Sequence, residues 1–577
     1  MTLQAVLLAA ALVAFPFVVH SSFHLNAAIL VFLFGAVAQA WNILGGYAGQ
    51  LSFGHSVFFG IGAYTSSVLL WRYAFTPWGG ALAGAFLAAT VSLIVGSPTF
   101  RLRRHFFALA TLALGEIARI TFLNWTYVGA AIGLYLPLQY RNIGTYMMWD
   151  GKRPYYMVAL GLCALAVALA ALIDRTRMGP YLRAINADED AARALGLHVL
   201  RYKQWAIATS AALTALAGSV YAQYVLYIDP YNVMTARISL LVVVIALIGG
   251  RATVWGPALG AVFIVLLSEY SRTVLGHLGE GYDFIVFGAA IMALSLYEPR
   301  GLYGLVRRVR SRPLPQIAGA AQDLIGPPSP VAAEAVLSIE DISKRFGGIA
   351  ALDRVGLSVR RGEVVCLIGP NGAGKSTLFD CITGFQRPDA GAVRLRDASL
   401  TGAPAHRVAL LGMVRAFQLV RVFSDLTVWE HMLVAQPHRN ESVWAALRRS
   451  APRVEGQGQA LLQFVGLLDS RGILADELSY GQQKLLAFAM ALMSGAEVIL
   501  LDEPTAGVSP QMTQQLIGHI REMNRQGRTF VIIEHNMAVV DALAHRVYFM
   551  ADGHILAEGT PEQIRGDPQV LEAYYGR

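Results

Sequence analysis

The sequence predicts a polytopic α-helical membrane domain followed by a water-soluble α/β domain, and three observations support this division. The first 100 of the 577 residues contain a single charged side chain, Arg72. From about residue 336 onward, charged residues are as frequent as in an ordinary soluble protein. Between the two parts, residues 306–335 contain five prolines among Ser, Ala, Gly and Arg, which predicts an extended linker.

The average composition, 15% charged and 55% hydrophobic residues, excludes several classes of protein. Typical soluble domains have about 25% charged residues, so an ordinary cytosolic enzyme is excluded, as are disordered, collagenous and disulfide-rich chains. The net charge of +8 would suit nucleic acid. Arg and Lys gather in short segments beside apolar stretches, however, as the positive-inside bias of membrane proteins predicts. We therefore expect a membrane and no nucleic acid as the partner of this charge.

The membrane part contains about ten apolar segments near the length of about 20 residues that a helix needs to cross a bilayer. They are residues 2–19, 26–44, 56–71, 79–97, 106–124, 155–173, 205–226, 236–249, 254–270 and 284–298. Because several are short, we predict eight to ten spans. Basic clusters at 101–104, 174–204 and 300–312 are separated by even numbers of segments, so all three can face the cytoplasm.

Residues 45–62 are rich in glycine at the depth of the membrane. Irregular backbone is tolerated there only where it is buried in protein or lines a cavity. One interpretation is a broken helix at a translocation path. The other is close helix packing through small residues. The sequence leaves both open.

A phosphate-binding motif follows the first apolar strand of the soluble part, at residues 363–368. A glycine-rich loop and then a helix come after this strand, which is the setting of a P-loop. Lys375 is expected to reach the β- and γ-phosphates of a nucleotide, and the Ser376 hydroxyl to ligate Mg²⁺. The predicted ATP-binding residues of the loop are Gly369, Pro370, Asn371, Gly372, Ala373, Gly374, Lys375, Ser376 and Thr377.

A second apolar strand, residues 498–502, ends in two acids. Asp502 is suited to be the carboxylate on the Mg²⁺ side of a P-loop NTPase. Glu503 follows it and can act on the attacking water as a general base or an orienting group. With a P-loop upstream, a solvated turn is the poorer explanation of this pair.

The sequence Leu-Ser-Tyr-Gly-Gln-Gln at 478–483 resembles the signature of ABC transporters, with Tyr480 where Gly is usual. In that family this loop binds the γ-phosphate of ATP held by another subunit. The resemblance therefore implies that Ser479, Tyr480, Gly481 and Gln482 act on the site of a second ATPase. It further implies roles for Phe346 in stacking on adenine, Gln418 of the Q-loop in Mg²⁺ binding and catalysis, His535 at the γ-phosphate, and residues 506–510 as the D-loop.

A long charged loop, residues 174–204, resembles the docking loop of bacterial ABC importer permeases in one stretch. That stretch is Asp-Ala-Ala-Arg-Ala-Leu-Gly at 190–196, with Asp190 in place of the usual Glu. The resemblance implies a coupling helix, formed by Asp190, Ala191, Ala192 and Gly196, that docks on the ATPase.

Stretches in both parts resemble the high-affinity branched-chain amino acid importer family. They are residues 412–418, 426–430, 566–568 and 573–576 in the soluble part, and 45–62, 183–197, 249–251 and 255–257 in the membrane part. The resemblance implies a fused permease and ATPase, with a permease domain at 1–305, a linker at 306–335 and an ABC ATP-binding domain at 336–577. It also implies ATP and Mg²⁺ as cofactors and the bacterial inner membrane as the location. The implied partners are a second permease, a second ATPase and a periplasmic solute-binding protein, with a homodimer as the alternative assembly.

Some alternatives stay open at this stage. Residues 128–134 depart from the permease's usual Thr-Gly-Gly pattern, so urea, short amides or aromatic acids are alternative solutes. A half-exporter of lipid or drug usually has six long helices, which the short spans disfavour. A membrane-tethered ATPase without transport activity is disfavoured by the number of spans.

Overall fold

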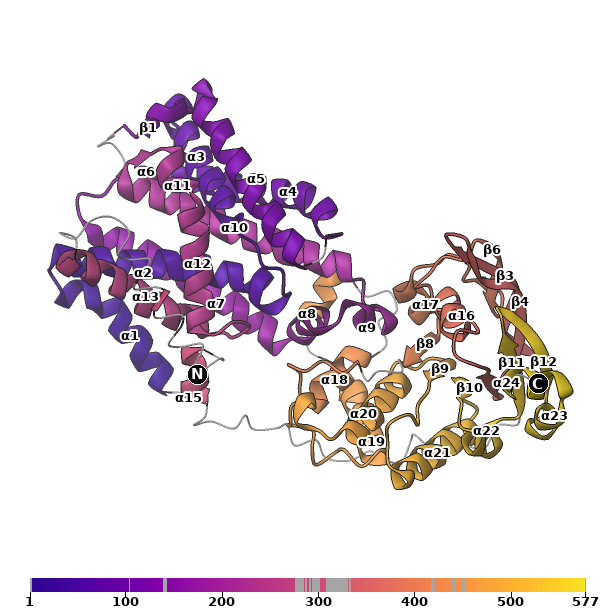
Figure 1. The fold of residues 1–577 in the computed structure, drawn as a ribbon. Coiled ribbons are helices and arrows are strands. Elements are labelled where there is room, and N and C mark those ends of the chain that lie inside the picture. The colour runs from indigo at the N-terminus through magenta and orange to yellow at the C-terminus, as the bar shows by residue number, and fades with distance from the viewer. Residues whose placement is uncertain are drawn as a thin grey trace. The chain divides into compact units, whose positions relative to one another are not determined.

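The computed structural model describes residues 3–102, 104–137, 143–275, 285, 288–289, 292, 301–307, 331, 334–416, 421–436, 442–448, 450 and 452–575. It divides into two compact units (Figure 1). One comprises Met1–Leu182 and Leu200–Pro313, and the other comprises Arg183–Val199 and Leu314–Arg577. Most of the linker, 306–335, lies outside the described residues, so the predicted domain boundaries stay predictions.

The first unit is helical, as the sequence predicts. Its helices are α1 (Leu3–Val18), α2 (Ser22–Trp41), α3 (His55–Tyr73), α4 (Pro77–Thr99), α5 (Arg104–Asn124), α6 (Ile143–Tyr146), α7 (Lys152–Arg175), α10 (Val199–Val225), α11 (Pro230–Val233), α12 (Ala236–Gly249), α13 (Gly256–Leu275) and α15 (Leu302–Arg307). Two short strands, β1 (Leu134–Tyr135) and β2 (Tyr227–Ile228), pair antiparallel. The helix α8 (Met178–Ala187) leads into the second unit.

Six of the described helical segments are long and apolar enough to cross a membrane. They are Ser22–Tyr47, Pro77–Thr99, His105–Asn124, Lys152–Arg175, Val199–Val225 and Pro230–Gly249. The apolar helices Val6–Val18 and Gly256–Ser271 are shorter. The predicted span 284–298 falls almost wholly outside the described residues, so the predicted total of eight to ten spans stays a prediction.

The glycine-rich stretch breaks the second helix, because α2 continues into a π-helical turn at Asn42–Tyr47 and then leaves helical geometry. Asn42 fixes this turn: its Nδ2 donates to the Thr253 carbonyl at 2.9 Å, and its Oδ1 accepts from the Ala252 N–H at 2.7 Å. His55 is fully buried, with ring nitrogens 3.2 Å and 2.8 Å from the hydroxyls of Ser52 and Ser210. The irregular backbone is therefore mostly buried in protein, which is compatible with both interpretations of this stretch.

The second unit contains two sheets within its described residues. The larger sheet has the order β12-β11-β5-β10-β9-β8, and all its pairs are parallel except β11 with β12. The smaller sheet is antiparallel, with the order β4-β3-β6-β7. The strands are β3 (Ala335–Phe346), β4 (Ile349–Arg360), β5 (Val364–Ile368), β6 (Ala390–Leu395), β7 (Ala398–Ser399), β8 (Met413–Ala416), β9 (Val498–Asp502), β10 (Thr529–Ile533), β11 (Arg546–Ala551) and β12 (His554–Gly559).

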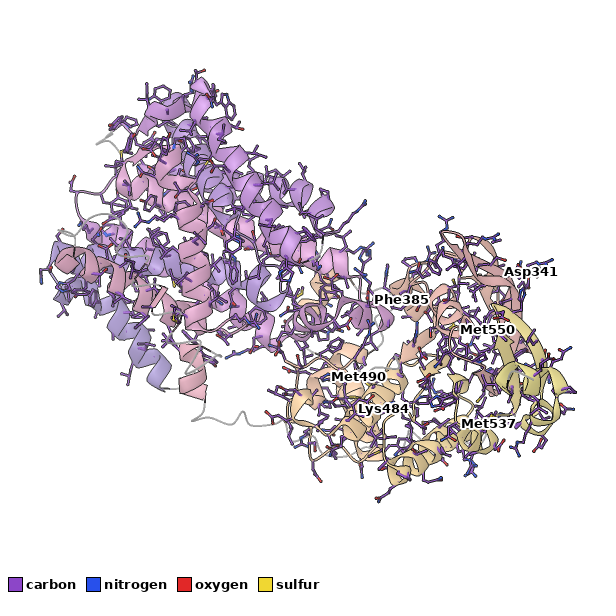
Figure 2. The ribbon with its side chains drawn as sticks, in the orientation of Figure 1. Asp341, Phe385, Lys484, Met490, Met537 and Met550 are labelled. Atoms are coloured by element: carbon purple, nitrogen blue, oxygen red, sulfur yellow. The ribbon has the colours of Figure 1, made fainter. Side chains whose placement is uncertain are left out.

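Helices accompany the larger sheet, and its parallel strands read as continuous apolar runs because both faces are covered. The helices of this unit are α9 (Glu189–Ala194), α16 (Lys375–Ile382), α17 (Ala405–Leu411), α18 (Val428–Ala435), α19 (Pro452–Phe464), α20 (Tyr480–Met493), α21 (Pro510–Arg525), α22 (Met537–Leu543), α23 (Pro561–Gly566) and α24 (Pro568–Tyr575). β5, β9 and β10 are buried along their whole length. Met550, labelled in Figure 2, joins the core that lies against the smaller sheet and α16. This arrangement places the carboxyl ends of β5 and β9 on one edge of the sheet, beside the P-loop.

Candidate functional site

The P-loop connects β5 to α16, as predicted, and three of its glycines occupy positions that side chains would disturb. Gly372 and Gly374 have positive φ angles of 85° and 100°, in the region that favours glycine. A Cβ on Gly369 would lie 1.9 Å from the Met550 carbonyl oxygen. The loop can therefore approach an anion with its backbone, and the N-terminus of α16 adds a favourable dipole.

Lys375 begins α16 and curls back over the loop. Its Nζ donates to the carbonyl oxygens of Gly369 and Pro370, each at 2.8 Å. Burial lowers the pKa of this ammonium, while Glu503 and Asp502 act in the opposite direction. Ser376, which follows Lys375 in the first turn of α16, is exposed and presents a hydroxyl. A cation and exposed N–H groups at one place fit the phosphates of a nucleotide.

Asp502 ends β9 and is 4% exposed, and a residue that the sequence analysis did not single out holds it. Arg415 of β8 donates through Nη2 to Asp502 Oδ2 at 2.7 Å and through Nη1 to Asp380 Oδ1. Its guanidinium also lies 5.6 Å from the centre of the Phe379 ring. Arg415 thus joins the P-loop helix, the Q-loop strand and the acid at the end of β9. The available signal was a charged residue within an otherwise apolar buried strand, Met-Val-Arg-Ala.

Replacing Arg415 with Met should destabilise the protein strongly, because the buried Asp502 loses its cationic partner. Removing one partner of a buried ion pair costs about 3–5 kcal/mol. Asp380→Asn is the matched control, because the Asp380 side chain is 37% exposed and its pairing is worth roughly 1 kcal/mol or less. Thermal unfolding of the purified full chain measures both variants. If both variants lost only a little stability, and to the same extent, the Arg415–Asp502 pair would not be the main stabilising contact of this cluster.

Glu503 occupies an unusual backbone conformation. Its φ angle is +46°, in the left-handed region that residues other than glycine seldom adopt. Its N–H donates to the Ile533 carbonyl at 2.9 Å, which ties the turn to β10. Its carboxylate Oε1 lies 3.8 Å from Nδ1 of His535. The structure therefore brings together two of the three residues predicted for catalysis.

Beyond Glu503, a second acid organises the turn. Glu534 is 1% exposed and accepts from the hydroxyl of Thr505 and from the backbone N–H of His535. His535 itself is exposed, with 61% of its side chain accessible. An exposed ring on a fixed backbone can reach a nucleotide phosphate in the way the resemblance implies. Gln418, the third predicted catalytic residue, lies outside the described residues.

The oxygen ligands predicted for Mg²⁺ fit that ion. Magnesium prefers a few carboxylate and hydroxyl oxygens together with phosphate oxygens and water. Asp502 ends β9 and Ser376 lies in the first turn of α16, so both lie where the strand ends and the P-loop helix meet. Arg415 engages one oxygen of Asp502, Oδ2.

Phe346 lies at the end of β3, in the hairpin that leads into β4. Its side chain is 48% exposed, and Nζ of Lys344 lies 5.5 Å from the centre of its ring. The following strand packs on the P-loop, since a Cβ on Gly374 would meet the Ala351 carbonyl at 2.5 Å. An exposed aromatic ring on this hairpin is available for stacking on a base.

The signature residues form the beginning of α20. Ser479 is the N-cap, and its hydroxyl accepts from the Gln482 N–H while Gln482 Oε1 accepts from the Ser479 N–H. Tyr480 is 41% exposed, and its ring lies 3.2 Å from the position of a Cβ on Gly507. The structure thus places the signature beside the D-loop and leaves its polar side chains at the surface of this unit.

The predicted coupling segment folds as part of the second unit, which contains Arg183–Val199. The predicted helix around residues 188–197 is confirmed as α9, with Asp188 as its N-cap. Ala191 and Ala192 are buried. Gly196 has a φ angle of +96°, and a Cβ there would lie 3.4 Å from Leu410 of α17. Ala191, Ala192 and Gly196 therefore place a short apolar face and a left-handed turn against α17, while the Asp190 side chain is 48% exposed.

Ion pairs surround this apolar contact. Nη2 of Arg183 donates to Glu430 Oε1 at 2.6 Å, and both side chains are largely buried. Arg421 lies 3.4 Å from Asp188 and 3.6 Å from Asp190. Glu430 also closes the capping box of α18 through its other oxygen. Charges of opposite sign on the segment and on the ATPase surface fix the register of α9.

Comparison with protein families assigns both parts of the chain. Residues 23–295 match the model described as the branched-chain amino acid transport system permease component. Residues 352–506 match the ABC transporter model, and residues 554–574 match that of the branched-chain amino acid ATP-binding cassette transporter. The relative from Escherichia coli (strain K12), high-affinity branched-chain amino acid transport ATP-binding protein LivG, is 41% identical over 249 residues. The match covers 42% of this chain and 98% of the relative.

The chain belongs to the branched-chain amino acid family of ABC transporters.

The ATPase part is also similar to further proteins. The ATP-binding protein BraF of Pseudomonas aeruginosa is 39% identical over 249 residues, covering 42% of this chain and 98% of BraF. A solved structure of a nucleotide-free ATP-binding cassette from an ABC transporter is 35% identical, with a TM-score of 0.38. It covers 42% of this chain and 100% of that chain. The chain is therefore an ABC importer with permease and ATPase parts in one polypeptide, and its ATPase is homologous to cassettes that hydrolyse ATP to drive transport.

Proposed function

We propose that this transporter imports branched-chain or other hydrophobic amino acids across the bacterial inner membrane, driven by Mg·ATP hydrolysis. The observation that supports this solute class is the agreement of two parts of the chain: the permease and the end of the ATPase each match a branched-chain amino acid model. Importers of urea, short amides or aromatic acids are the alternative. The stretch 128–134 bears on that alternative, because it departs from the usual Thr-Gly-Gly pattern: Val128 replaces the Thr, and Ala130, with a φ of +47°, replaces the second Gly.

The chain supplies one permease and one ATPase, and the signature must complete a second ATP site. The partners are accordingly a second permease, a second ATPase and a periplasmic solute-binding protein. A homodimer of this chain is the alternative assembly. Exposed signature side chains at the start of α20 support a partner on that face of the ATPase.

The proposed nucleotide site combines residues that lie at or just after the ends of several strands. The P-loop and Lys375 bind the β- and γ-phosphates, while Phe346 stacks on the base. Asp502, Ser376 and Gln418 hold Mg²⁺, which supplies positive charge that offsets charge developing on the phosphates. Glu503 orients and deprotonates the attacking water, and His535 contacts the γ-phosphate. The left-handed turn at Glu503 supports this role, because strained backbone gathers at functional sites.

Uptake by membrane vesicles tests the solute class. Right-side-out vesicles loaded with ATP would carry the full chain together with the second permease, the second ATPase and the binding protein of its complex. We expect ATP-dependent uptake of labelled leucine, with competition by isoleucine and valine and none by excess urea, acetamide or phenylacetate. Uptake of urea, acetamide or phenylacetate in place of leucine would overturn the amino-acid assignment and leave the importer assignment intact.

A substitution at Gly196 tests coupling through α9. Gly196→Leu places a side chain in a left-handed conformation, 3.4 Å from Leu410, so the segment can no longer seat on α17. The affinity for ATP should stay within about two-fold of wild type. The rate of ATP-dependent solute uptake should fall about ten-fold or more. Gly456→Leu is the matched control, since nothing lies within 4 Å of a Cβ at that glycine. Full uptake by the Gly196 variant would refute coupling through this segment.

A further inference from the structure

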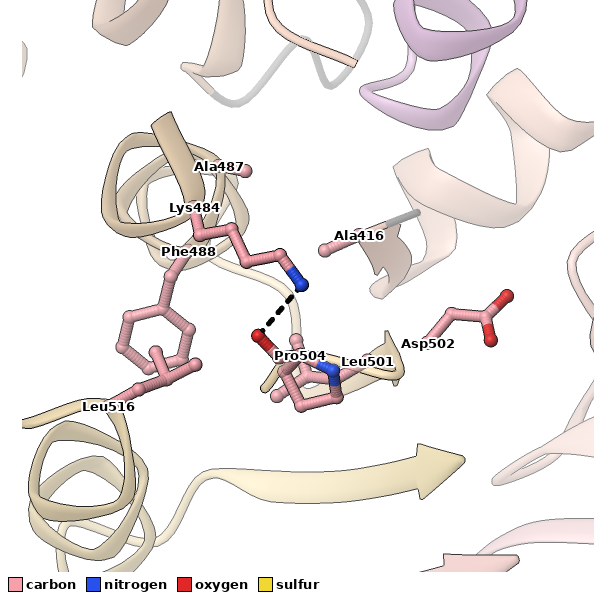
Figure 3. Close-up of a pocket in the computed structure, with 8 residues that line it drawn as sticks. All are labelled: Ala416, Lys484, Ala487, Phe488, Leu501, Asp502, Pro504 and Leu516. Atoms are coloured by element: carbon pink, nitrogen blue, oxygen red, sulfur yellow. Dashed lines mark hydrogen bonds between the residues drawn. The ribbon is translucent and has the colours of Figure 1, made fainter. Parts of the chain in front are cut away.

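Lys484 is a buried cation that none of the roles described above uses. It lies on α20, one turn after the signature residues, and is 7% exposed (Figure 2). Its Nζ donates to the carbonyl oxygens of Glu503 and Pro504, each at 3.0 Å. Figure 3 shows the ammonium reaching from α20 to the Pro504 carbonyl, just beyond the end of β9.

The two carbonyls belong to the turn that carries Glu503. A φ of +46° at Glu503 is disfavoured for a residue with a Cβ, and such a conformation persists only where the surroundings hold it. The N–H of Glu503 is fixed by the Ile533 carbonyl, at 2.9 Å. Lys484 fixes the other side of the same residue, its carbonyl. Hydrogen bonds from an ammonium are charge-assisted and stronger than bonds between neutral groups.

The surroundings of Lys484 keep the ammonium at this place. A small cavity of about 30 Å³ beside it is lined mainly by apolar side chains, including Phe488, Leu501 and Leu516 (Figure 3). The Tyr480 ring centre lies 5.5 Å from Nζ. Burial lowers the pKa of Lys484, and the negative charges of Glu534 and Glu503 act against that. A cation in so apolar a setting is stabilised by the carbonyls and the aromatic ring, so its position is tied to theirs.

We propose that Lys484 is a positioning residue for Glu503, and that it joins the turn carrying Glu503 to the signature helix. This inference rests on the proposed role of Glu503. The signature at the start of α20 acts on ATP held by the second ATPase, whereas Glu503 acts on water in its own site. The side chain of Lys484, on the signature helix, donates to the backbone carbonyls of Glu503 and Pro504. It is therefore a direct structural link between the two ATP sites of the complex.

The test compares Lys484→Met with wild type in the full chain, assembled with its partner subunits. Met keeps the length and apolar packing of the stem but donates no hydrogen bond. We expect kcat for ATP hydrolysis to fall on the order of 10–100-fold, because the reacting group is displaced rather than removed. The KM for ATP, and binding of a fluorescent ATP analogue, should stay within about two-fold of wild type. Lys484→Arg keeps two donors and a positive charge, and should recover most of the lost kcat.

Two controls separate positioning from a general loss of structure. Ser494→Ala removes a hydrogen-bonding side chain from the other end of the same helix, where the hydroxyl donates to the Ala491 carbonyl at 2.6 Å. Its kcat should match wild type. Glu503→Gln in the same assay reports whether Glu503 itself carries hydrolysis, so failure of the proposed function is seen separately.

Three outcomes would overturn the proposal. The first is wild-type kcat in Lys484→Met while Glu503→Gln is inactive. The second is a loss of kcat in Lys484→Met matched by an equal loss of nucleotide binding and a lower unfolding temperature, which would mark a role in folding alone. The third is an Arg variant that folds, binds nucleotide and is as slow as the Met variant.

Discussion

Replacing Glu503 with Gln should abolish ATP hydrolysis and solute uptake while ATP still binds. Gln keeps the shape of the side chain and its place 3.8 Å from His535, but it removes the charge that can polarise and deprotonate water. Loss of a general base costs about 10²–10⁴-fold in rate. Because Asp502, Lys375 and the P-loop are untouched, the affinity for ATP should change by less than about three-fold.

A phosphate-release assay on the reconstituted complex, with nucleotide binding measured in parallel, checks this expectation. Glu572→Gln is the matched control, because it makes the same chemical change at an exposed position on α24. It should leave the rate unaltered. Near-normal hydrolysis by the Glu503 variant would remove Glu503 from the catalytic role proposed here.

Replacing Lys375 with Ala should weaken nucleotide binding itself. In the structure its ammonium donates to two P-loop carbonyls at 2.8 Å, so it is already poised over the loop that receives the phosphates. Hydrogen bonds to a charged group contribute about 1.5–3 kcal/mol, which predicts roughly a 10–100-fold loss of ATP affinity. Hydrolysis at saturating ATP should fall as well, since the cation also faces charge developing on the γ-phosphate.

Equilibrium binding of a fluorescent ATP analogue to the full chain measures the effect. Arg525→Ala removes a cation whose side chain is 72% exposed on α21, and its affinity should equal that of wild type. Unchanged affinity in the Lys375 variant would show that this ammonium does not bind the phosphates.

The parts of the ATP site that the sequence predicted are those encoded locally. The P-loop was recognisable because its strand, loop and helix are consecutive, and β9 spans the predicted residues 498–502. The roles of Arg415 and Lys484 were not recognisable, because their partners are distant in sequence. Arg415 bonds to groups 35 and 87 residues away, and Lys484 to groups 19 and 20 residues away. Spacing along the chain carries no signal for such contacts.

The membrane part was predicted at the level of apolar segments and less well in detail. Hydropathy indicated where helices run, since about 20 apolar residues must cover the hydrocarbon core. It left the glycine-rich stretch open between a solute path and close helix packing. It also could not indicate that Asn42 bonds to Ala252 and Thr253, because these residues lie more than 200 residues along the chain. The predicted loop 174–204 proved more ordered than expected, since α8, α9 and the start of α10 occupy most of it.

The coupling segment has a consequence for how such a gene can be divided. Residues 183–199 interrupt the permease sequence, yet they fold with the ATPase. The permease and ATPase parts are therefore connected in two ways. One is the covalent link through the proline-rich stretch at 306–335, and the other is the packing of residues 183–199 with the ATPase. Only the first of these connections depends on translation as a single chain. We expect the two products of a gene split at that stretch to recognise each other through contacts of Arg183, Glu430 and Gly196. Gene fusion thus fixes the ratio of permease to ATPase at one to one. The residues of the permease that contact the ATPase belong to the permease sequence and do not depend on the fusion.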